Sequence, residues 1–149
     1  LLATEPPASP EIRADAYYDL GIGFYRQGDE AAGGDDHREA QRLFREAADA
    51  FRRSLRIRPG NADAGWNLEL ALRRTYDATP DPKLVVAVGD CGACGGIFGS
   101  SYASCGAVAN VIPVDVVVPG CPPSPTRLLA GILAAISKSP AESAGSSGL

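Results

Sequence analysis

The residues of this chain best suited to chemistry are its four cysteines, which all lie in the second half of the sequence: Cys91, Cys94, Cys105 and Cys121. Thiolates bind soft metals, and the Cys-x-x-Cys spacing of Cys91 and Cys94 is common in iron–sulfur and zinc sites. A disulfide framework is the alternative, and it requires an oxidising compartment. The cysteines alone therefore indicate a metal site, redox chemistry or structural thiols.

Other kinds of catalytic site find little support. His37 is the only histidine and stands in a polar stretch, where a solvated side chain is expected. The glycine-rich run around Gly92 and Gly96 lacks the Gly-Lys-Ser/Thr ending of a phosphate-binding loop. Asp90 and Asp115 are too few for paired-carboxylate catalysis.

The cysteines are placed by a pattern of buried strands. Residues 84–88 and 114–118 are short Val-rich runs that end at glycine, which is typical of buried parallel strands. Residues 89–100 read as a glycine-rich loop, 101–109 as a short helix or irregular segment, and 126–136 as an apolar helix. Cys91 and Cys121 each follow a strand, so we expect both at the carboxyl edge of the sheet, where such folds bind ligands.

The distribution of charge divides the chain into two parts. The net charge is −4, which gives no electrostatic case for nucleic acid binding. Beyond residue 80 only Lys83, Arg127 and Lys138 are basic, and a surface so poor in charge usually lies against another protein. No apolar run reaches the roughly 20 residues that span a bilayer. Residues 138–149 are rich in Ser and Gly and are predicted to be disordered.

The first part of the chain has the apolar periodicity of amphipathic helices. Three helices are expected, over residues 14–27, 38–57 and 62–74, with Gly28-Asp29 ending the first and a loop over 29–36. This part resembles a tetratricopeptide repeat, with a longer segment between Gly28 and Ala47 than that repeat has. The resemblance implies a docking surface for a protein partner, and a helical hairpin that only packs is the alternative.

The second part carries long motifs that resemble one family. They are Val85-Val86-Ala87-Val88-Gly89-Asp90-Cys91, Gly95-Gly96-Ile97-Phe98, Ser101-Tyr102 and Val111-Ile112-Pro113-Val114-Asp115-Val116-Val117-Val118-Pro119-Gly120-Cys121-Pro122-Pro123. These runs resemble the 20 kDa-type subunit of NADH:quinone oxidoreductase and the small subunit of membrane-bound NiFe hydrogenases. The segment 101–106 looks closer to the hydrogenase branch, and the match is expected to begin near Leu72.

That resemblance implies a 4Fe–4S cluster, for which Cys91 and Cys121 match two of the family's ligands. The other two are an adjacent Cys-Cys pair on an upstream strand, which this chain does not contain. Cys94 and Cys105 are candidate additional ligands; zinc or no metal is the alternative. The implied partner is the large catalytic subunit of a complex I or hydrogenase assembly. The implied location is cytoplasmic, peripheral on the inner membrane face through that complex.

The predicted architecture is α/β: a tetratricopeptide-like helical hairpin over residues 11–76, a partial doubly wound parallel-sheet domain over 77–137 and a tail over 138–149. Two functions follow. The first is an iron–sulfur electron-transfer subunit, or a fragment of one, and so a component of an oxidoreductase. The second is a non-enzymatic interaction or assembly protein with a cluster-free or zinc-bound α/β remnant. A natural fusion and a chimera of two sequences would show the same change in composition.

Overall fold

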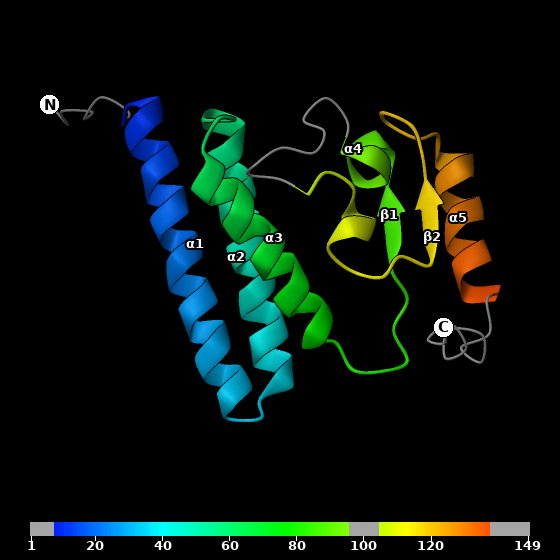
Figure 1. The fold of residues 1–149 in the computed structure, drawn as a ribbon, viewed down its shortest axis with the longest axis horizontal. Coiled ribbons are helices and arrows are strands. Elements are labelled where there is room, and N and C mark those ends of the chain that lie inside the picture. The colour runs from blue at the N-terminus through cyan, green and yellow to red at the C-terminus, as the bar shows by residue number, and fades with distance from the viewer. Residues whose placement is uncertain (1–7, 96–104, 138–149) are drawn as a thin grey trace, which may run out of the picture. The chain divides into compact units, whose positions relative to one another are not determined.

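The computed structural model describes residues 8–95 and 105–137, which form two compact units that divide between Thr79 and Pro80 (Figure 1). The first unit contains α1 (Pro10–Gly33), α2 (His37–Ile57) and α3 (Ala62–Asp77). The elements of the second unit are β1 (Val86–Val88), α4 (Gly89–Cys94), η2 (Val108–Asn110), β2 (Val116–Val118) and α5 (Pro125–Ser137). The predicted tail over 138–149 lies outside the described residues.

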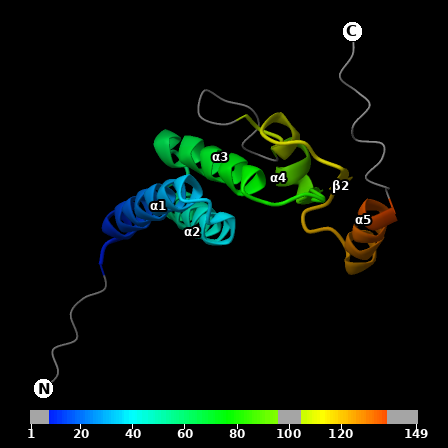
Figure 2. The same ribbon diagram turned by 90° about the horizontal axis from the view of Figure 1, so that it is seen from below.

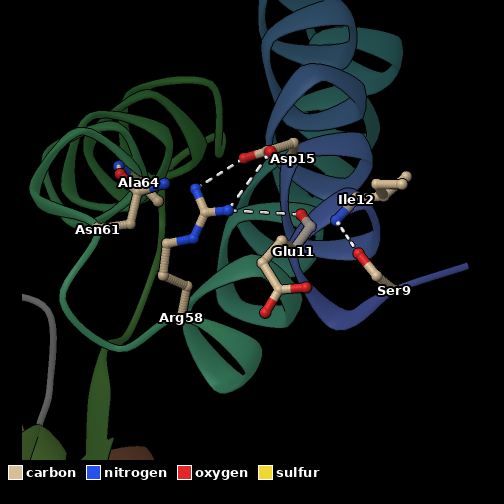
Figure 3. A network of polar contacts seen from close by, with 7 residues as sticks. All are labelled: Ser9, Glu11, Ile12, Asp15, Arg58, Asn61 and Ala64. Atoms are coloured by element: carbon tan, nitrogen blue, oxygen red, sulfur yellow. Dashed lines mark hydrogen bonds and ion pairs between the residues drawn. The ribbon is translucent and has the colours of Figure 1, made fainter.

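Each helix of the first unit begins at a side chain that caps it. The Ser9 hydroxyl accepts a hydrogen bond from the backbone N–H of Ile12 (3.3 Å), and Pro10 follows at the first helical position. Asp36 caps α2 through the N–H of Glu39 (3.1 Å). The Asn61 side chain accepts from the N–H of Ala64 (3.1 Å) at the start of α3, beside the network drawn in Figure 3.

The first helix is longer than its sequence predicts, and the predicted loop over 29–36 is mostly helical. α1 continues through Gly28-Asp29 to Gly33, and only Gly34–Asp36 form the turn, with Asp35 in the left-handed region (φ 62°). A Cβ on Gly28 would lie 2.7 Å from Cε1 of Phe44. The close approach of α2 therefore accounts for a glycine whose helix propensity alone would favour an end. His37 is accordingly the first residue of α2 rather than part of a loop.

The core of the helical unit is built on two phenylalanines of α2. Phe51 is fully buried and Phe44 is 1% exposed. A Cβ on Gly21 of α1 would lie 2.5 Å from Cε1 of Phe51, so both rings lie directly against α1 at a glycine. Tyr18 and Tyr25 of α1 pack beside these rings, with ring centroids 5.8 Å and 5.5 Å away. Figure 2 shows α1 and α2 side by side with α3 along them.

A polar network joins the ends of the helices at the surface of this unit (Figure 3). The Arg58 guanidinium donates to both carboxylate oxygens of Asp15, at 2.7 Å and 3.4 Å, and to the carbonyl oxygen of Glu11 at 3.5 Å. Both side chains of this ion pair are largely exposed, so the pair contributes little free energy of folding. It does fix the chain end of α2 against the first turns of α1.

The second unit contains a parallel pair of strands, as the sequence predicts, although both strands are shorter than expected. β1 and β2 pair in the register Val86↔Val116, Ala87↔Val117 and Val88↔Val118. Upstream of this pairing, the Asp115 carboxylate accepts from the backbone N–H of Val85 at 2.8 Å. The carbonyl of Val85 also accepts from the backbone N–H groups of Asp115 (2.9 Å) and Val116 (3.3 Å), so the side-chain contact adds to the backbone bonds at the beginning of the strands.

α5 follows β2 and packs on one face of the sheet. A Cβ on Gly131 would clash with Cγ2 of Val118, so the helix lies directly on β2 at this glycine. Ala135 and Val118 are buried, at 2% and 3% exposed. Of the predicted segment over 101–109, residues 101–104 lie outside the described part and 108–109 belong to η2. None of the described helices is both long and apolar enough to cross a membrane.

The described elements are consistent with the predicted α/β class at the coarse level: a helical unit, and a unit with a two-stranded parallel sheet. Its finer parts, the tetratricopeptide likeness of the helices and the doubly wound order of the sheet, stay predictions.

Candidate metal centre

The candidate centre lies at the carboxyl end of the sheet, where β1 leads into α4 and β2 leads into the loop before α5 (Figure 1). Of the predicted loop over 89–100, residues 89–94 form the short helix α4, so this part of the prediction is wrong, and residues 96–100 lie outside the described part. Gly95, with φ 84°, ends α4 and its N–H donates to the carbonyl of Cys91 at 3.1 Å. A left-handed glycine commonly ends a helix. The glycine content of this segment therefore reflects a helix end as well as a loop.

Two hydrogen bonds between Asp90 and Gly120 hold the two loops together. The Gly120 N–H donates to Oδ1 of Asp90 at 2.7 Å, and the Asp90 N–H donates to the carbonyl of Gly120 at 3.3 Å. Cys91 and Cys121 each follow one member of this pair directly in sequence. The two cysteines are therefore carried by neighbouring loops at one edge of the sheet.

A glycine with positive φ lies one or two residues before each of these cysteines. Gly89 has φ +83° and Gly120 has φ +130°, conformations that L side chains rarely adopt. A Cβ on Gly120 would also lie 2.8 Å from Cα of Pro123. The two Gly-containing turns bring the strand ends close enough for the Asp90 carboxylate to reach the backbone N–H of Gly120.

Cys94 and Cys105 do not follow a strand directly. Cys94 lies at the end of α4, and its thiol donates to the carbonyl of Asp90 at 3.2 Å, an interaction within its own helix. Cys105 lies before η2, and its carbonyl accepts from the Asn110 side chain at 2.6 Å. All four thiols belong to the described residues, each cysteine is exposed, and no disulfide joins them.

The donor set fits only part of a four-thiolate metal site. A 4Fe–4S cluster of this type takes four cysteine thiolates, and a structural zinc site takes four ligands. Within residues 8–95 and 105–137, no group of three or more Cys, His, Asp or Glu side chains is gathered where it could hold a metal ion. Cys91 and Cys121 share an edge, Cys94 is one helical turn from Cys91, and the described chain does not complete a site by itself.

Asp90 is the residue whose importance the sequence analysis missed. From the sequence alone, Asp90 is notable only as a possible catalytic carboxylate, whereas in the structure this carboxylate accepts a backbone hydrogen bond from the second cysteine loop. The available signal was an aspartate directly before the first cysteine and directly after a strand, a position from which a side chain reaches a neighbouring strand end.

Comparison with known proteins places this region in a family. The family model described as the NADH ubiquinone oxidoreductase 20 kDa subunit matches residues 52–135, more than half of the chain. The match begins earlier than the expected Leu72, and it includes the end of α2 and all of α3.

Curated relatives, all B-type subunits of NADH-quinone oxidoreductase, agree with this assignment. The one from Heliobacterium modesticaldum is 50% identical over 68 residues, covering 46% of this chain and 39% of the relative. One from Salinispora tropica is 49% identical over 79 residues, covering 53% of this chain and 42% of that protein. One from Chloroflexus aurantiacus is 56% identical over 62 residues, covering 42% of this chain and 35% of the relative.

The chain thus spans about two fifths of the length of the curated relatives it matches. The matched stretch contains both strands, α4, most of α5 and the loops that carry Cys91 and Cys121. The chain belongs to the family of the 20 kDa subunit of NADH ubiquinone oxidoreductase.

Proposed function

We propose that this chain serves as an electron-transfer component of a complex I-like NADH:quinone oxidoreductase, in which Cys91 and Cys121 supply two thiolate ligands of an iron–sulfur cluster. Family membership supports the type of complex. The observation that carries the proposal is the Asp90–Gly120 pair, because it joins the two loops on which these cysteines stand.

The remaining ligands come from outside this pair. Cys94 is the nearer candidate in sequence, since it follows Cys91 on α4, and Cys105 is the other. A second polypeptide that carries the family's adjacent Cys-Cys pair is the third source. In this proposal the chain docks on a large catalytic subunit, and that complex holds it peripherally at the cytoplasmic membrane face.

The part played by this chain's own residues is positioning. Gly89 and Gly120, at positive φ, shape the turns that lead into the two cysteine loops. Backbone N–H groups that donate to the sulfurs of a cluster tune its potential. The Asp90 carboxylate holds Gly120, and with it the loop of Cys121, beside α4. When bound, an iron–sulfur cluster supplies one-electron transfer.

The test is anaerobic reconstitution with iron and sulfide, performed on the full chain alone and on the chain co-expressed with the unmatched part of the Heliobacterium relative. Iron and acid-labile sulfide per chain and the broad visible absorbance of a cluster are measured. Cys91→Ala and Cys121→Ala should each abolish both signals. Cys94→Ala and Cys105→Ala, made in parallel, report which of these thiols completes the site. Absence of bound iron from both samples contradicts the proposal, as does iron that survives the Cys91→Ala/Cys121→Ala double substitution.

A second candidate is an interaction protein without a cluster. It is favoured by one observation, that the described residues gather no group of three metal-ligating side chains. In that case the helical unit docks a protein partner and the thiols stay unligated or bind zinc with outside ligands. Unchanged partner binding by the quadruple Cys→Ala chain, together with absence of iron, would support this candidate.

A further inference from the structure

The α/β unit leaves a continuous apolar stripe uncovered on α5. Leu129, Ile132, Leu133 and Ile136 are 59%, 41%, 56% and 66% exposed. Their spacing of i, i+3, i+4 and i+7 places them on one side of the helix. The side that packs on the sheet is a different one, formed by Leu128, Gly131 and Ala135. A helix that is apolar on two sides is usually buried on both.

The sheet beneath α5 is also incomplete. In the described residues each strand pairs only with the other, so β1 and β2 each have one edge without a strand. Val88 is 45% exposed and Val117 is 47% exposed. Parallel sheets are normally covered on both faces, and a two-stranded ribbon is at best marginally stable in water. The sheet therefore also has exposed apolar side chains that a packing partner would bury.

This region has few charged side chains that could form ion pairs with a partner. Arg127, at the first turn, is the only charged residue of α5. Of the aspartates in this unit, Asp90 and Asp115 accept hydrogen bonds from backbone N–H groups of Gly120 and Val85, and Asp81 forms an ion pair with Lys83. The occupant of the stripe must therefore be recognised by apolar contact and strand pairing, not by ion pairs.

The relatives indicate what that occupant is. Sequences 49–56% identical to this stretch occur in proteins of which the stretch makes up only 35–42%. In those proteins more than half of the chain lies outside the stretch that matches β1, β2 and most of α5, which leaves room for further strands and a covering helix. A second copy of this chain would bring only another incomplete sheet of the same kind.

We propose that the stripe of Leu129, Ile132, Leu133 and Ile136, with the open edges of β1 and β2, is the docking surface for the complementary segment of a domain of this same family. That segment adds at least one strand to the sheet and lays an apolar surface on α5. The inference rests on family membership and on the exposed stripe, and it does not depend on whether a cluster forms.

The experiment co-expresses the full chain with the part of the Heliobacterium modesticaldum relative that lies outside its match to this chain. A one-to-one complex should co-purify and persist at high salt, because ion pairs contribute little to it. Hydrogen exchange should slow in β1, β2 and α5 on binding, while α1 and α2 stay unchanged.

Two neighbouring substitutions on α5 test the stripe itself. Leu133→Asp places a carboxylate in the apolar contact and should weaken the complex roughly a hundredfold or more, since an unpaired buried polar group costs several kcal/mol. Ala134→Asp is the matched control, because Ala134 is exposed on the side away from both the stripe and the sheet. It should bind like the parent chain. Circular dichroism of both uncomplexed variants should match the parent.

Three results would overturn the inference. The first is absence of a complex at micromolar concentrations while both partners are folded. The second is equal binding by the Leu133→Asp and Ala134→Asp chains. The third is a homodimer of this chain that Leu133→Asp dissociates, because the stripe would then be a self-association surface. Iron content is measured separately, so failure of cluster binding and failure of docking are distinguishable.

Discussion

The helical unit and the α/β unit bury their apolar side chains to different degrees. In the helical unit two aromatic rings, Phe44 and Phe51, are enclosed between α1 and α2. The described core of the α/β unit consists of small side chains, Ala87, Val118 and Ala135, with Ile112. Both units expose large apolar side chains: they are Ile12, Leu20, Trp66 and Leu70 in the helical unit, and in the α/β unit four of them lie together on α5. The helical unit buries two aromatic rings, whereas the described core of the α/β unit contains no aromatic side chain. The two units therefore differ in the size of the side chains that they bury.

Of the substitutions that test this difference in burial, loss of a buried ring should change the free energy of unfolding most. Phe51→Ala removes a fully buried ring and should lower the free energy of unfolding of the helical unit by about 3–5 kcal/mol. Urea denaturation followed by circular dichroism measures it. The control is Trp66→Ala, a large aromatic that is 54% exposed and should cost much less. Equal losses would mean that the two helices do not enclose the core as described.

Two glycines of α1 offer a sharper test of the same packing. Gly21→Ala puts a methyl group against the Phe51 ring and should destabilise the unit by about 1–3 kcal/mol. Gly23→Ala meets nothing within 4 Å and should stabilise α1 by up to about 1 kcal/mol, because alanine has the higher helix propensity. Thermal unfolding of both variants should therefore shift in opposite directions. Shifts of the same sign would contradict the close contact at Gly21.

The α/β unit is probed by Asp90→Ala, which removes the acceptor of the Gly120 N–H. Since hydrogen bonds to charged groups contribute about 1.5–3 kcal/mol and Asp90 is only half buried, we expect a loss near the lower value. Hydrogen exchange at Gly120 measures it directly. Asp90→Asn keeps an acceptor oxygen and should recover part of the protection. Unchanged exchange at Gly120 in the Asp90→Ala chain would contradict the hydrogen bond that links the two cysteine loops.

The smallest effect is expected at the surface of α2. Hydrogen bonds from the Arg42 guanidinium lower the pKa of the Glu39 carboxyl below its ordinary value. A lowered folded-state pKa gives stability that is present above the ordinary glutamate pKa of about 4.3 and is lost as the pH falls through the lower folded value. Parent and Glu39→Gln chains, compared by thermal unfolding, should differ slightly at neutral pH and converge in acid. A difference in thermal stability that grows as the pH falls would contradict a lowered pKa of Glu39 in the folded chain.

Prediction from the sequence succeeded where the signal was local. The Val-rich runs ending at glycine located both strands, and the apolar run after Pro125 located α5. The order strand, cysteine, strand, cysteine placed Cys91 and Cys121 at neighbouring strand ends. The motifs around these cysteines also indicated the family that the comparison established.

Prediction failed where a distant segment decides the local structure. Gly28-Asp29 reads as a helix end, yet α1 continues because Phe44 packs against Gly28. The run after Gly89 reads as a loop, yet it forms α4, and the first turn of that helix is tied to Gly120 through Asp90. Neither contact partner is close in the sequence, so propensity and periodicity carried no information about it.

The sequence by itself therefore determined the family, the paired strands and the positions of four cysteines along the chain. Only the tertiary structure decided that Asp90 bridges to Gly120, that no three described ligands meet, and that α5 presents a second apolar side. The physical reason is that a residue's type and spacing fix its local preference and its chemical capacity. Its partners and its burial depend on which segments pack together, and those segments can lie far apart in the sequence.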